Sequence, residues 1–207
     1  MIKTILFDLG GVIITLDQAE AIRRFREIGL SDAEQRLNAY TQSGIFGDLE
    51  MGLIDAEEFR SRLSALMGNE VTYEQCLYAW KGYVGDVPMR NLLTLRKLRT
   101  EGFRIVLLSN TNPYMMSWAL SSEFDGKGQA LDYYIDDAYL SYKCRMMKPD
   151  ECFFRYVIEK EGVSPDNLLF VDDGLHNVEN AASLGIKTFQ PENGSDWTNE
   201  IYKYLNQ

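Results

Sequence analysis

Five residues of this 207-residue sequence have the chemical character that phosphoryl transfer requires: Asp8, Ser109, Lys148, Asp172 and Asp173. A carboxylate such as that of Asp8 can attack phosphorus and form a covalent intermediate that water then hydrolyses. Carboxylate and phosphate repel each other, so the reaction needs a cation. Mg²⁺ suits, because it prefers the hard oxygen ligands that several aspartates supply. A serine hydroxyl and nearby N–H groups can bind phosphate oxygens, and a lysine adds positive charge.

Each of these residues is weak evidence when taken alone. An aspartate after a strand is usually a turn former or a helix cap, and the tripeptide at Ser109 is usually a turn. The evidence becomes stronger because Asp8, Ser109 and Asp172 each follow an apolar run, while Lys148 precedes Pro149 and a predicted helix. Open α/β sheets bind ligands beyond the carboxyl ends of their strands, so these residues are expected to meet at one edge of a sheet.

Short apolar runs of β-forming residues, separated by helical patterns, must position these side chains. Runs that are apolar on both faces are typical of buried parallel strands. Their alternation with helices predicts a Rossmann-like α/β fold, a parallel sheet with helices on both faces. Helices are expected to begin at Pro88, after Asp150 and around Ser195. The runs cover residues 2–7, 104–108, 168–171 and 186–189, with a weaker one at 133–140.

Residues 17–86 interrupt this alternation, because they contain four candidate helices and no convincing strand. We interpret this segment as an α-helical cap domain inserted into a core domain of residues 1–16 and 87–207. Three capping boxes support helices in the cap. They are Ser31 with Glu34, Asp55 with Glu58, and Thr72 with Gln75.

The composition limits the classes of partner. A net charge of −10 argues against a nucleic acid or an anionic membrane, since both attract basic surfaces. No stretch approaches the roughly 18 apolar residues that a membrane span needs. The opening segment, residues 1–8, is too short and contains charged residues too early to be a signal peptide. The three cysteines have no metal-ligand spacing and are interpreted as reduced thiols, which favours a cytoplasmic location. A catalytic cysteine is disfavoured, because the single histidine, His176, is near none of them in sequence.

Four segments resemble motifs I to IV of the haloacid dehalogenase-like hydrolase superfamily. They are Phe7-Asp8-Leu9-Gly10-Gly11-Val12-Ile13, Leu108-Ser109-Asn110-Thr111, Lys148-Pro149-Asp150 and Phe170-Val171-Asp172-Asp173. The segments 49–59 and 177–185 also resemble the cap and the helix after the fourth motif. With its Asp-Leu-Gly first motif and a helical cap of the C1 type, the chain is similar to a glucose-1-phosphatase-like subgroup.

The resemblance implies an enzyme, a phosphoric monoester hydrolase that acts on a small phosphorylated metabolite such as a sugar phosphate. It implies that Asp8 is the nucleophile and forms an aspartyl phosphate. Ser109 and Asn110 would hold the phosphoryl group, and Lys148 would bridge the phosphate and Asp8. A monomer is expected, with a homodimer as the alternative.

The resemblance also implies a Mg²⁺ site. Asp8 and Asp173 would be direct ligands, and the backbone oxygen of Gly10 would complete the protein ligands. Asp172 would support the metal or its water shell.

The first motif departs from the family pattern at Gly10, where most phosphatases of the superfamily carry an aspartate that acts as general acid and base. Such catalysis typically contributes about 10²–10⁴-fold, so its loss should slow turnover without removing the nucleophile. The substrate could have a good leaving group, such as a sugar anomeric oxygen. Alternatively, His176 or Asp17 could supply the proton, or the chain could be a weakly active or inactive phospho-ligand-binding relative.

Other positions leave alternatives open. Arg145 stands where related sequences usually have glycine, and it is either a surface residue or a charge near the mouth of the site. Tyr40, Phe46 and Tyr83 of the cap could face the substrate, although helical spacing favours ordinary packing. A haloacid dehalogenase is the alternative enzyme. It attacks carbon without a metal, so it would not need the two adjacent acids Asp172 and Asp173.

Overall fold

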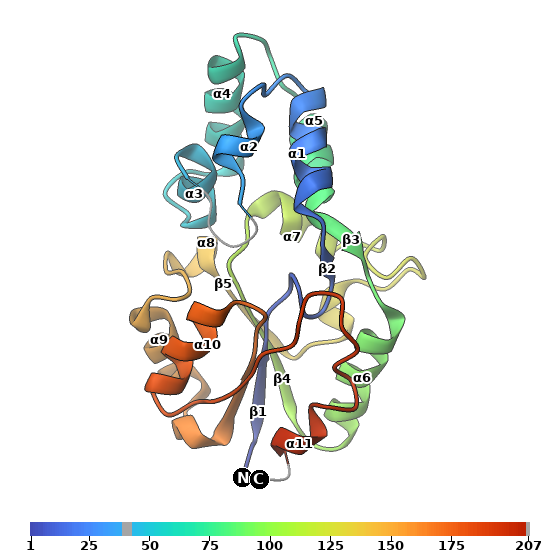
Figure 1. Ribbon diagram of the computed structural model, residues 1–207, viewed down its shortest axis with the longest axis vertical. Helices are drawn as coiled ribbons and strands as arrows, with labels where there is room; N and C mark the ends of the chain where they lie inside the picture. Colours follow the sequence, from blue (N-terminus) through green and yellow to red (C-terminus); the bar gives the residue numbers. More distant parts are fainter. Residues whose placement is uncertain (39–42, 206–207) are drawn as a thin grey trace.

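The protein contains a five-stranded parallel sheet with the strand order β5-β4-β1-β6-β7 (Figure 1). The computed structural model describes residues 1–38 and 43–205. Strand β1 lies at the centre, so the residue that follows it lies in the middle of the sheet edge. The strands are β1 (Thr4–Phe7), β4 (Arg104–Ser109), β5 (Asp137–Leu140), β6 (Leu168–Val171) and β7 (Lys187–Phe189).

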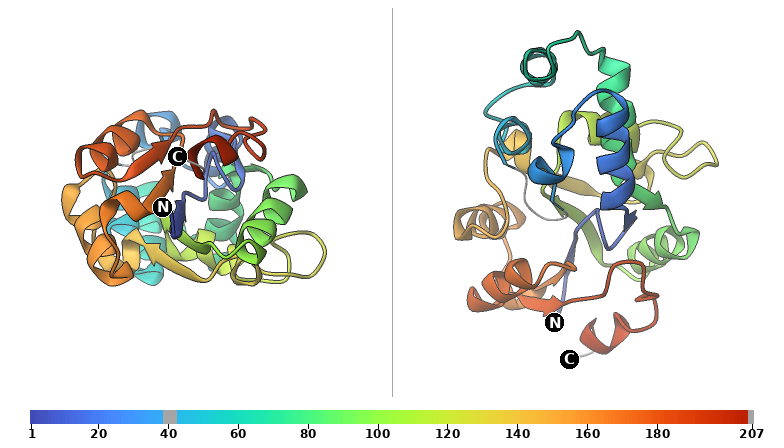
Figure 2. Two further views of the ribbon diagram at one scale, coloured as in Figure 1. Left: turned by 90° about the horizontal axis from the view of Figure 1, so that it is seen from below. Right: turned by 45° about the horizontal axis from the view of Figure 1, so that its top comes forward.

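The alternation of side chains along β1 explains why both faces of the sheet are covered. Ile5 and Phe7 belong to one hydrophobic core and Leu6 belongs to the other. All three are fully buried, as expected for a central strand of a parallel sheet. Figure 2 shows helices on both sides of the sheet, which confirms the predicted α/β architecture.

Two of the helices that surround the sheet begin near the residues that the sequence indicated, after Pro88 and after Asp150. Pro88 precedes α6, and Gly162 ends α9 in a left-handed conformation. The last helix differs, since it begins at Tyr202 rather than around Ser195. These helices are α6 (Met89–Thr100), α7 (Pro113–Ala119), α8 (Ser141–Cys144), α9 (Glu151–Glu161), α10 (Leu175–Ser183) and α11 (Tyr202–Leu205).

In the described part of residues 17–86, five helices and a 3-10 helix form the helical cap above the carboxyl edge of the sheet (Figure 1). Phe25, Phe46, Phe59 and Trp80 lie at its centre, and the ring centroids of the pairs in contact are 5.2 to 5.9 Å apart. Phe46 is therefore a packing residue and does not line the pocket described below. The helices are α1 (Gln18–Glu27), α2 (Ala33–Arg36), α3 (Ile45–Glu50), α4 (Ala56–Met67), α5 (Tyr73–Trp80) and the 3-10 helix η1 (Lys81–Tyr83).

Two of the three expected caps hold these helices. Thr72 and Gln75 form a full capping box, and the Asp55 side chain accepts a hydrogen bond from the backbone of Glu58. The expectation for Ser31 is wrong, because α2 is preceded by Asp32 and has no side-chain cap.

The cap joins the core through two short strands that the sequence did not predict. Strands β2 (Thr15–Leu16) and β3 (Val84–Asp86) pair in antiparallel fashion where the chain enters and leaves the cap. The backbone N–H of Asp17 also donates to the oxygen of Tyr83 at 3.0 Å.

Within the described residues, no helix is long and apolar enough to cross a membrane. The division into residues 17–86 and the two core segments stays a prediction.

Candidate active site

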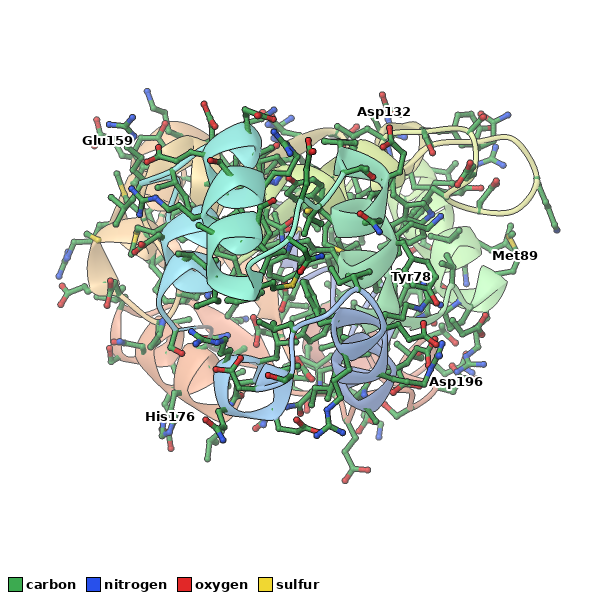
Figure 3. All side chains as sticks on the ribbon, turned by 90° about the horizontal axis from the view of Figure 1, so that it is seen from above. Tyr78, Met89, Asp132, Glu159, His176 and Asp196 are labelled. Atoms are coloured by element: carbon green, nitrogen blue, oxygen red, sulfur yellow. The ribbon has the colours of Figure 1, made fainter. Side chains whose placement is uncertain are left out.

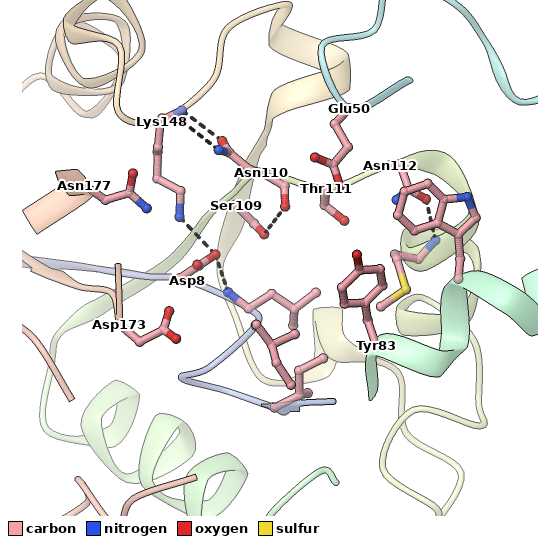
Figure 4. Close-up of a pocket in the computed structure, with 16 residues that line it drawn as sticks. Asp8, Glu50, Tyr83, Ser109, Asn110, Thr111, Asn112, Lys148, Asp173 and Asn177 are labelled. Atoms are coloured by element: carbon pink, nitrogen blue, oxygen red, sulfur yellow. Dashed lines mark hydrogen bonds and ion pairs between the residues drawn. The ribbon is translucent and has the colours of Figure 1, made fainter. Parts of the chain in front are cut away.

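A pocket lies between the cap and the carboxyl ends of the central strands, with about 650 Å³ of space that is partly open to solvent. Its core-side lining comes from the loops after β1, β4 and β6 and from Lys148. Its cap-side lining includes Glu50, Trp80 and Tyr83 (Figure 4). The predicted strand-end residues therefore do meet at one edge of the sheet. Those that line the pocket are Asp8, Gly10, Ser109, Asn110, Lys148 and Asp173.

Lys148 connects two of the aspartates. Its Nζ lies 3.0 Å from Oδ1 of Asp8 and 2.6 Å from Oδ2 of Asp172, and its side chain is 1% exposed. Burial alone would lower the pKa of Lys148, but the charges of Asp172 and Asp8 outweigh it and raise this pKa. The lysine is therefore a fixed positive charge beside the Asp8 carboxylate.

Asp172 is fully buried and holds the ammonium group of Lys148 in place. Its Oδ1 accepts hydrogen bonds from the backbone N–H of Gly174 at 2.8 Å and from the side chain of Asn177 at 3.0 Å. Asn177 was not predicted as a site residue. It lies in the first turn of α10, directly after the fourth motif, and this position was its available signal.

Asn110 positions the lysine segment rather than pointing freely into the pocket. Its side-chain N–H donates to the backbone oxygen of Lys148 at 2.8 Å, and its Oδ1 accepts from the backbone N–H of Lys148 at 2.9 Å. Ser141 holds the same loop, because its hydroxyl accepts from the backbone N–H of Thr111 and donates to the Thr111 oxygen. The end of β4 is thus bound to the segment that carries the lysine.

Three carboxylates lie close enough to share one cation. Ligand oxygens of Asp8, Asp172 and Asp173 all lie within 4.8 Å of one another. Burial raises the pKa of Asp8 to about 7, and although Lys148 opposes this shift, the charges of Asp172 and Asp173 add to it. A divalent cation would relieve this repulsion, and carboxylate oxygens are the donors that Mg²⁺ prefers, so the residues fit the metal.

Glycine fits at positions 10 and 11 for two different structural reasons. Gly11 has a φ of 76°, and a Cβ there would lie 2.2 Å from Oδ2 of Asp173. A side chain at this position would displace the acidic cluster. At Gly10 a Cβ would lie 2.8 Å from Cδ2 of Leu16, so this leucine fills the space beside the missing family aspartate.

Neither residue proposed from the sequence to replace that aspartate lies in the pocket. The carboxylate of Asp17 accepts from the backbone N–H of Glu20 at 2.9 Å and caps α1 on the surface. His176 is 86% exposed and points away from the molecule in Figure 3. Both are outside the pocket lining.

Arg145 lies outside the pocket, whereas Tyr83 of the cap lines it. Arg145 is exposed and outside the pocket, and with a φ of 54° it occupies the left-handed region in which glycine is favoured. Tyr83 lines the pocket, and its hydroxyl donates to the backbone oxygen of Asn38 at 2.9 Å. Tyr40 lies outside the described residues.

Glu50 is a pocket residue that the sequence reasoning missed. It is 7% exposed, and burial raises the pKa of its carboxyl group to about 8. A hydrogen bond with the Asn112 side chain opposes this shift, whereas the charge of Asp8 adds to it. The available signal was its position four residues after Phe46, on the buried face of a helix, where an acid is unusual.

A family model described as haloacid dehalogenase-like hydrolase matches residues 2–185. The chain therefore belongs to the haloacid dehalogenase-like hydrolases, as its motifs indicated.

Individual relatives cover all or nearly all of the chain. A D-ribitol-5-phosphate phosphatase from Bacteroides thetaiotaomicron is 46% identical over 206 residues, which are 100% of both chains. A solved HAD-like family hydrolase from Porphyromonas gingivalis is 40% identical with a TM-score of 0.94, over 100% of this chain and 99% of that one. A HAD family enzyme from Bacteroides thetaiotaomicron, solved with magnesium and inorganic phosphate, is 37% identical with a TM-score of 0.88. The match covers 97% of this chain and 100% of that one.

Proposed function

We propose that this protein is a Mg²⁺-dependent phosphatase of small phosphorylated sugars or polyols, and that D-ribitol 5-phosphate is the first substrate to test. The observation that carries the proposal is the cluster of Asp8, Asp172 and Asp173 with Lys148 at the carboxyl edge of the sheet. The substrate follows from the 46% identical D-ribitol-5-phosphate phosphatase, which matches this chain from end to end.

Asp8, Asp173 and the backbone oxygen of Gly10 would hold Mg²⁺, and Asp172 would support them through its contact with Lys148. When bound, the ion supplies positive charge that offsets the repulsion between the phosphate and the carboxylates. The magnesium and phosphate in the 37% identical relative support this choice of metal.

Asp8 forms and breaks the covalent bond to phosphorus. In the first half-reaction a carboxylate oxygen of Asp8 bonds to phosphorus while the P–O bond of the ester breaks, and the leaving alkoxide takes up a proton. In the second, the oxygen of a water molecule bonds to phosphorus, the P–O bond to Asp8 breaks, and the water gives up a proton. Inorganic phosphate and the free carboxylate result.

The remaining core residues hold the phosphoryl group. The Ser109 hydroxyl and the backbone N–H of Asn110 bind non-bridging oxygens, and Lys148 neutralises part of their charge. Since the Asn110 side chain is occupied by the backbone of Lys148, we assign it a positioning role and expect it to contact the phosphoryl group through its backbone.

A panel of phosphate esters, assayed with Mg²⁺ and with EDTA, tests the proposal. It should contain D-ribitol 5-phosphate, sugar phosphates, a nucleotide and an aryl phosphate. We expect the highest kcat/KM on the polyol or sugar esters and no turnover in EDTA. Binding of esters without any turnover would instead indicate a phospho-ligand-binding protein. Metal-independent release of chloride from 2-chloropropionate would indicate a dehalogenase.

Asp8→Asn should lower kcat by more than about 10⁴-fold, because it removes the nucleophile and one metal ligand. The amide keeps the shape of the side chain, so the melting temperature should change little. Asp17→Asn is the matched control: it changes an exposed aspartate that caps α1, and it should keep the turnover of the wild type. Near-native, Mg²⁺-dependent activity of Asp8→Asn would refute the proposed nucleophile.

We also propose a cytoplasmic monomer as the working form. The free thiols of Cys76, Cys144 and Cys152 support the location, because disulfides are rare in reducing compartments. Light scattering coupled to size-exclusion chromatography would measure the mass, for which the monomer predicts 23.8 kDa.

A further inference from the structure

The cap contributes a carboxyl group of its own to the pocket. Glu50 ends α3 on the face that also buries Phe46 and Leu49. Figure 4 shows its side chain directed from the cap toward the space lined by Asp8 and Thr111. A buried acid is costly unless its surroundings satisfy it, so its presence in a ligand pocket requires an explanation.

The surroundings of Glu50 favour its protonated form. Burial raises its pKa to about 8, a hydrogen bond with Asn112 lowers it, and the charge of Asp8 raises it. The other titratable groups of the pocket are those of Asp173, Lys148 and Tyr83. Lys148 is bound to Asp8 and Asp172, so the cation of the pocket is held at the core.

The charged groups on the helices packed against α3 have other partners. On α4, Arg62 pairs with Glu58 and lies 3.8 Å from Asp48, which is on α3 itself. On α8, the Nζ of Lys143 lies 5.9 Å from the ring centroid of Tyr142. Glu50 can therefore carry a proton at neutral pH without an adjacent basic group to remove it.

The core has no candidate for the same task among the described residues of the pocket. The carboxyl groups in the lining are those of Asp8, Asp173 and Glu50. Asp8 is the proposed nucleophile and Asp173 a proposed metal ligand, whereas Gly10 has no side chain and Leu16 occupies the adjacent space. D-Ribitol 5-phosphate is the ester of an ordinary primary alcohol, whose oxygen needs a proton to leave.

We propose that Glu50 is the general acid and base of the reaction, delivered by the cap to replace the aspartate that is absent at position 10. The inference rests on the proposed phosphatase function. The proton of the Glu50 carboxyl group moves to the ester oxygen as the ester P–O bond breaks, which leaves Glu50 as a carboxylate. That carboxylate accepts a proton from the attacking water as the second P–O bond forms, and the acid is restored.

Glu50→Gln tests the role, because glutamine keeps the shape and cannot donate the proton. Its kcat/KM should be compared with that of the wild type on D-ribitol 5-phosphate and on p-nitrophenyl phosphate, whose aryl oxide leaves without protonation. This ratio reports only the steps up to cleavage of the ester P–O bond, so the hydrolysis of the aspartyl phosphate, which both esters share, does not enter it. We expect kcat/KM to fall by about 10²–10⁴-fold on the alkyl ester and by less than about 10-fold on the aryl ester. The fall in wild-type kcat/KM on the alkyl ester as pH rises past Glu50's pKa should also disappear.

Asp48→Asn on the same helix is the matched control. It removes a negative charge from α3 at a side chain that is 38% exposed, and it should leave the activity on both esters unchanged. Equal losses of kcat/KM in Glu50→Gln on the two esters would overturn the inference, and so would an increase in KM alone, since these indicate packing or hydroxyl binding. Unchanged kcat/KM on the alkyl ester would also overturn it.

Wild-type activity separates this inference from the proposed function. If the wild type hydrolyses another alkyl phosphate in place of D-ribitol 5-phosphate, the substrate proposal fails, and the comparison is made with that ester. If the wild type hydrolyses no ester, the phosphatase proposal fails and the role of Glu50 falls with it. If the wild type is active and Glu50→Gln lowers kcat/KM equally on the two esters, the role of Glu50 alone is refuted.

Discussion

Two buried carboxyl groups, those of Asp8 and Glu50, face the same pocket from different parts of the chain, and their partners differ. Asp8 lies 3.0 Å from the ammonium group of Lys148, whereas Glu50 is bonded to the neutral amide of Asn112. The cation favours an anionic nucleophile, whereas at Glu50 burial and the charge of Asp8 outweigh the Asn112 hydrogen bond and favour a protonated acid. This division of roles is common where enzymes use two carboxyl groups.

The raised pKa of Glu50 has a cost in stability that depends on pH. An unfolded Glu50 releases its proton near its ordinary pKa of 4.5, whereas the folded protein retains it up to about pH 8. The stability contributed by this group is therefore greatest at low pH, falls between these two values and is then constant. Glu50→Gln avoids the fall and should be more stable than the wild type at pH 8, by on the order of a few kcal/mol.

Urea unfolding of both metal-free proteins at pH 5 and pH 8 measures this difference. The advantage of Glu50→Gln should be small at pH 5 and larger at pH 8. Asp48→Asn, changed on the same helix at an exposed position, controls for charge removal from the cap. A Glu50→Gln variant that is less stable at both pH values would show that the carboxyl group contributes mainly to packing.

Gly10 allows a complementary test of the missing acid. In a Glu50→Gln background, Gly10→Asp should raise kcat on the alkyl ester by at least about 10-fold, because it restores a proton donor beside the nucleophile. The methyl groups of Leu16 must move to admit the new Cβ, so Leu16→Ala should increase the gain. Gly10→Asn has the same size without a transferable proton, and a gain equal to that of Gly10→Asp would contradict the explanation.

At the scale of helices and strands, apolar runs that end at a polar residue were informative. The run before Asp8 predicted β1, and the runs before Ser109 and Asp172 predicted its two neighbours in the sheet. The strands β2 and β3 could not be predicted in this way. Two or three residues have no periodicity to detect, and their pairing joins positions such as Thr15 and Asp86 that are distant in sequence.

Arg145 offers a test of backbone strain at the end of α8. The left-handed conformation costs an ordinary residue roughly 1–2 kcal/mol, and glycine adopts it without this penalty. Arg145→Gly should therefore raise the free energy of unfolding by up to about 1 kcal/mol, measured by urea denaturation. Lys143→Gly, inside the same helix and also exposed, should lower it by about 1 kcal/mol. A loss of stability in Arg145→Gly would mean that contacts of its side chain outweigh the strain.

At the scale of the whole molecule, the core half of the site could be predicted and the cap half could not. Asp8, Ser109 and Asp173 line the pocket because parallel strands bring their carboxyl ends together, and Lys148 joins them from the loop before α9. Glu50 reaches the same pocket through the packing of the cap on the core. No local pattern encodes that contact, whereas Asp17 and His176 stand out in the sequence because they lie close to the first and fourth motifs.

The division of the pocket between two parts of the chain also affects how such an enzyme can diversify. In the usual family pattern, nucleophile and acid lie two residues apart, so an altered cap changes substrate preference and leaves the proton donor in place. Here the proposed donor, Glu50, lies on the segment whose Trp80 and Tyr83 also line the pocket. A cap exchanged between relatives would then carry its proton donor with it, and substrate range and acid strength would be inherited as one unit.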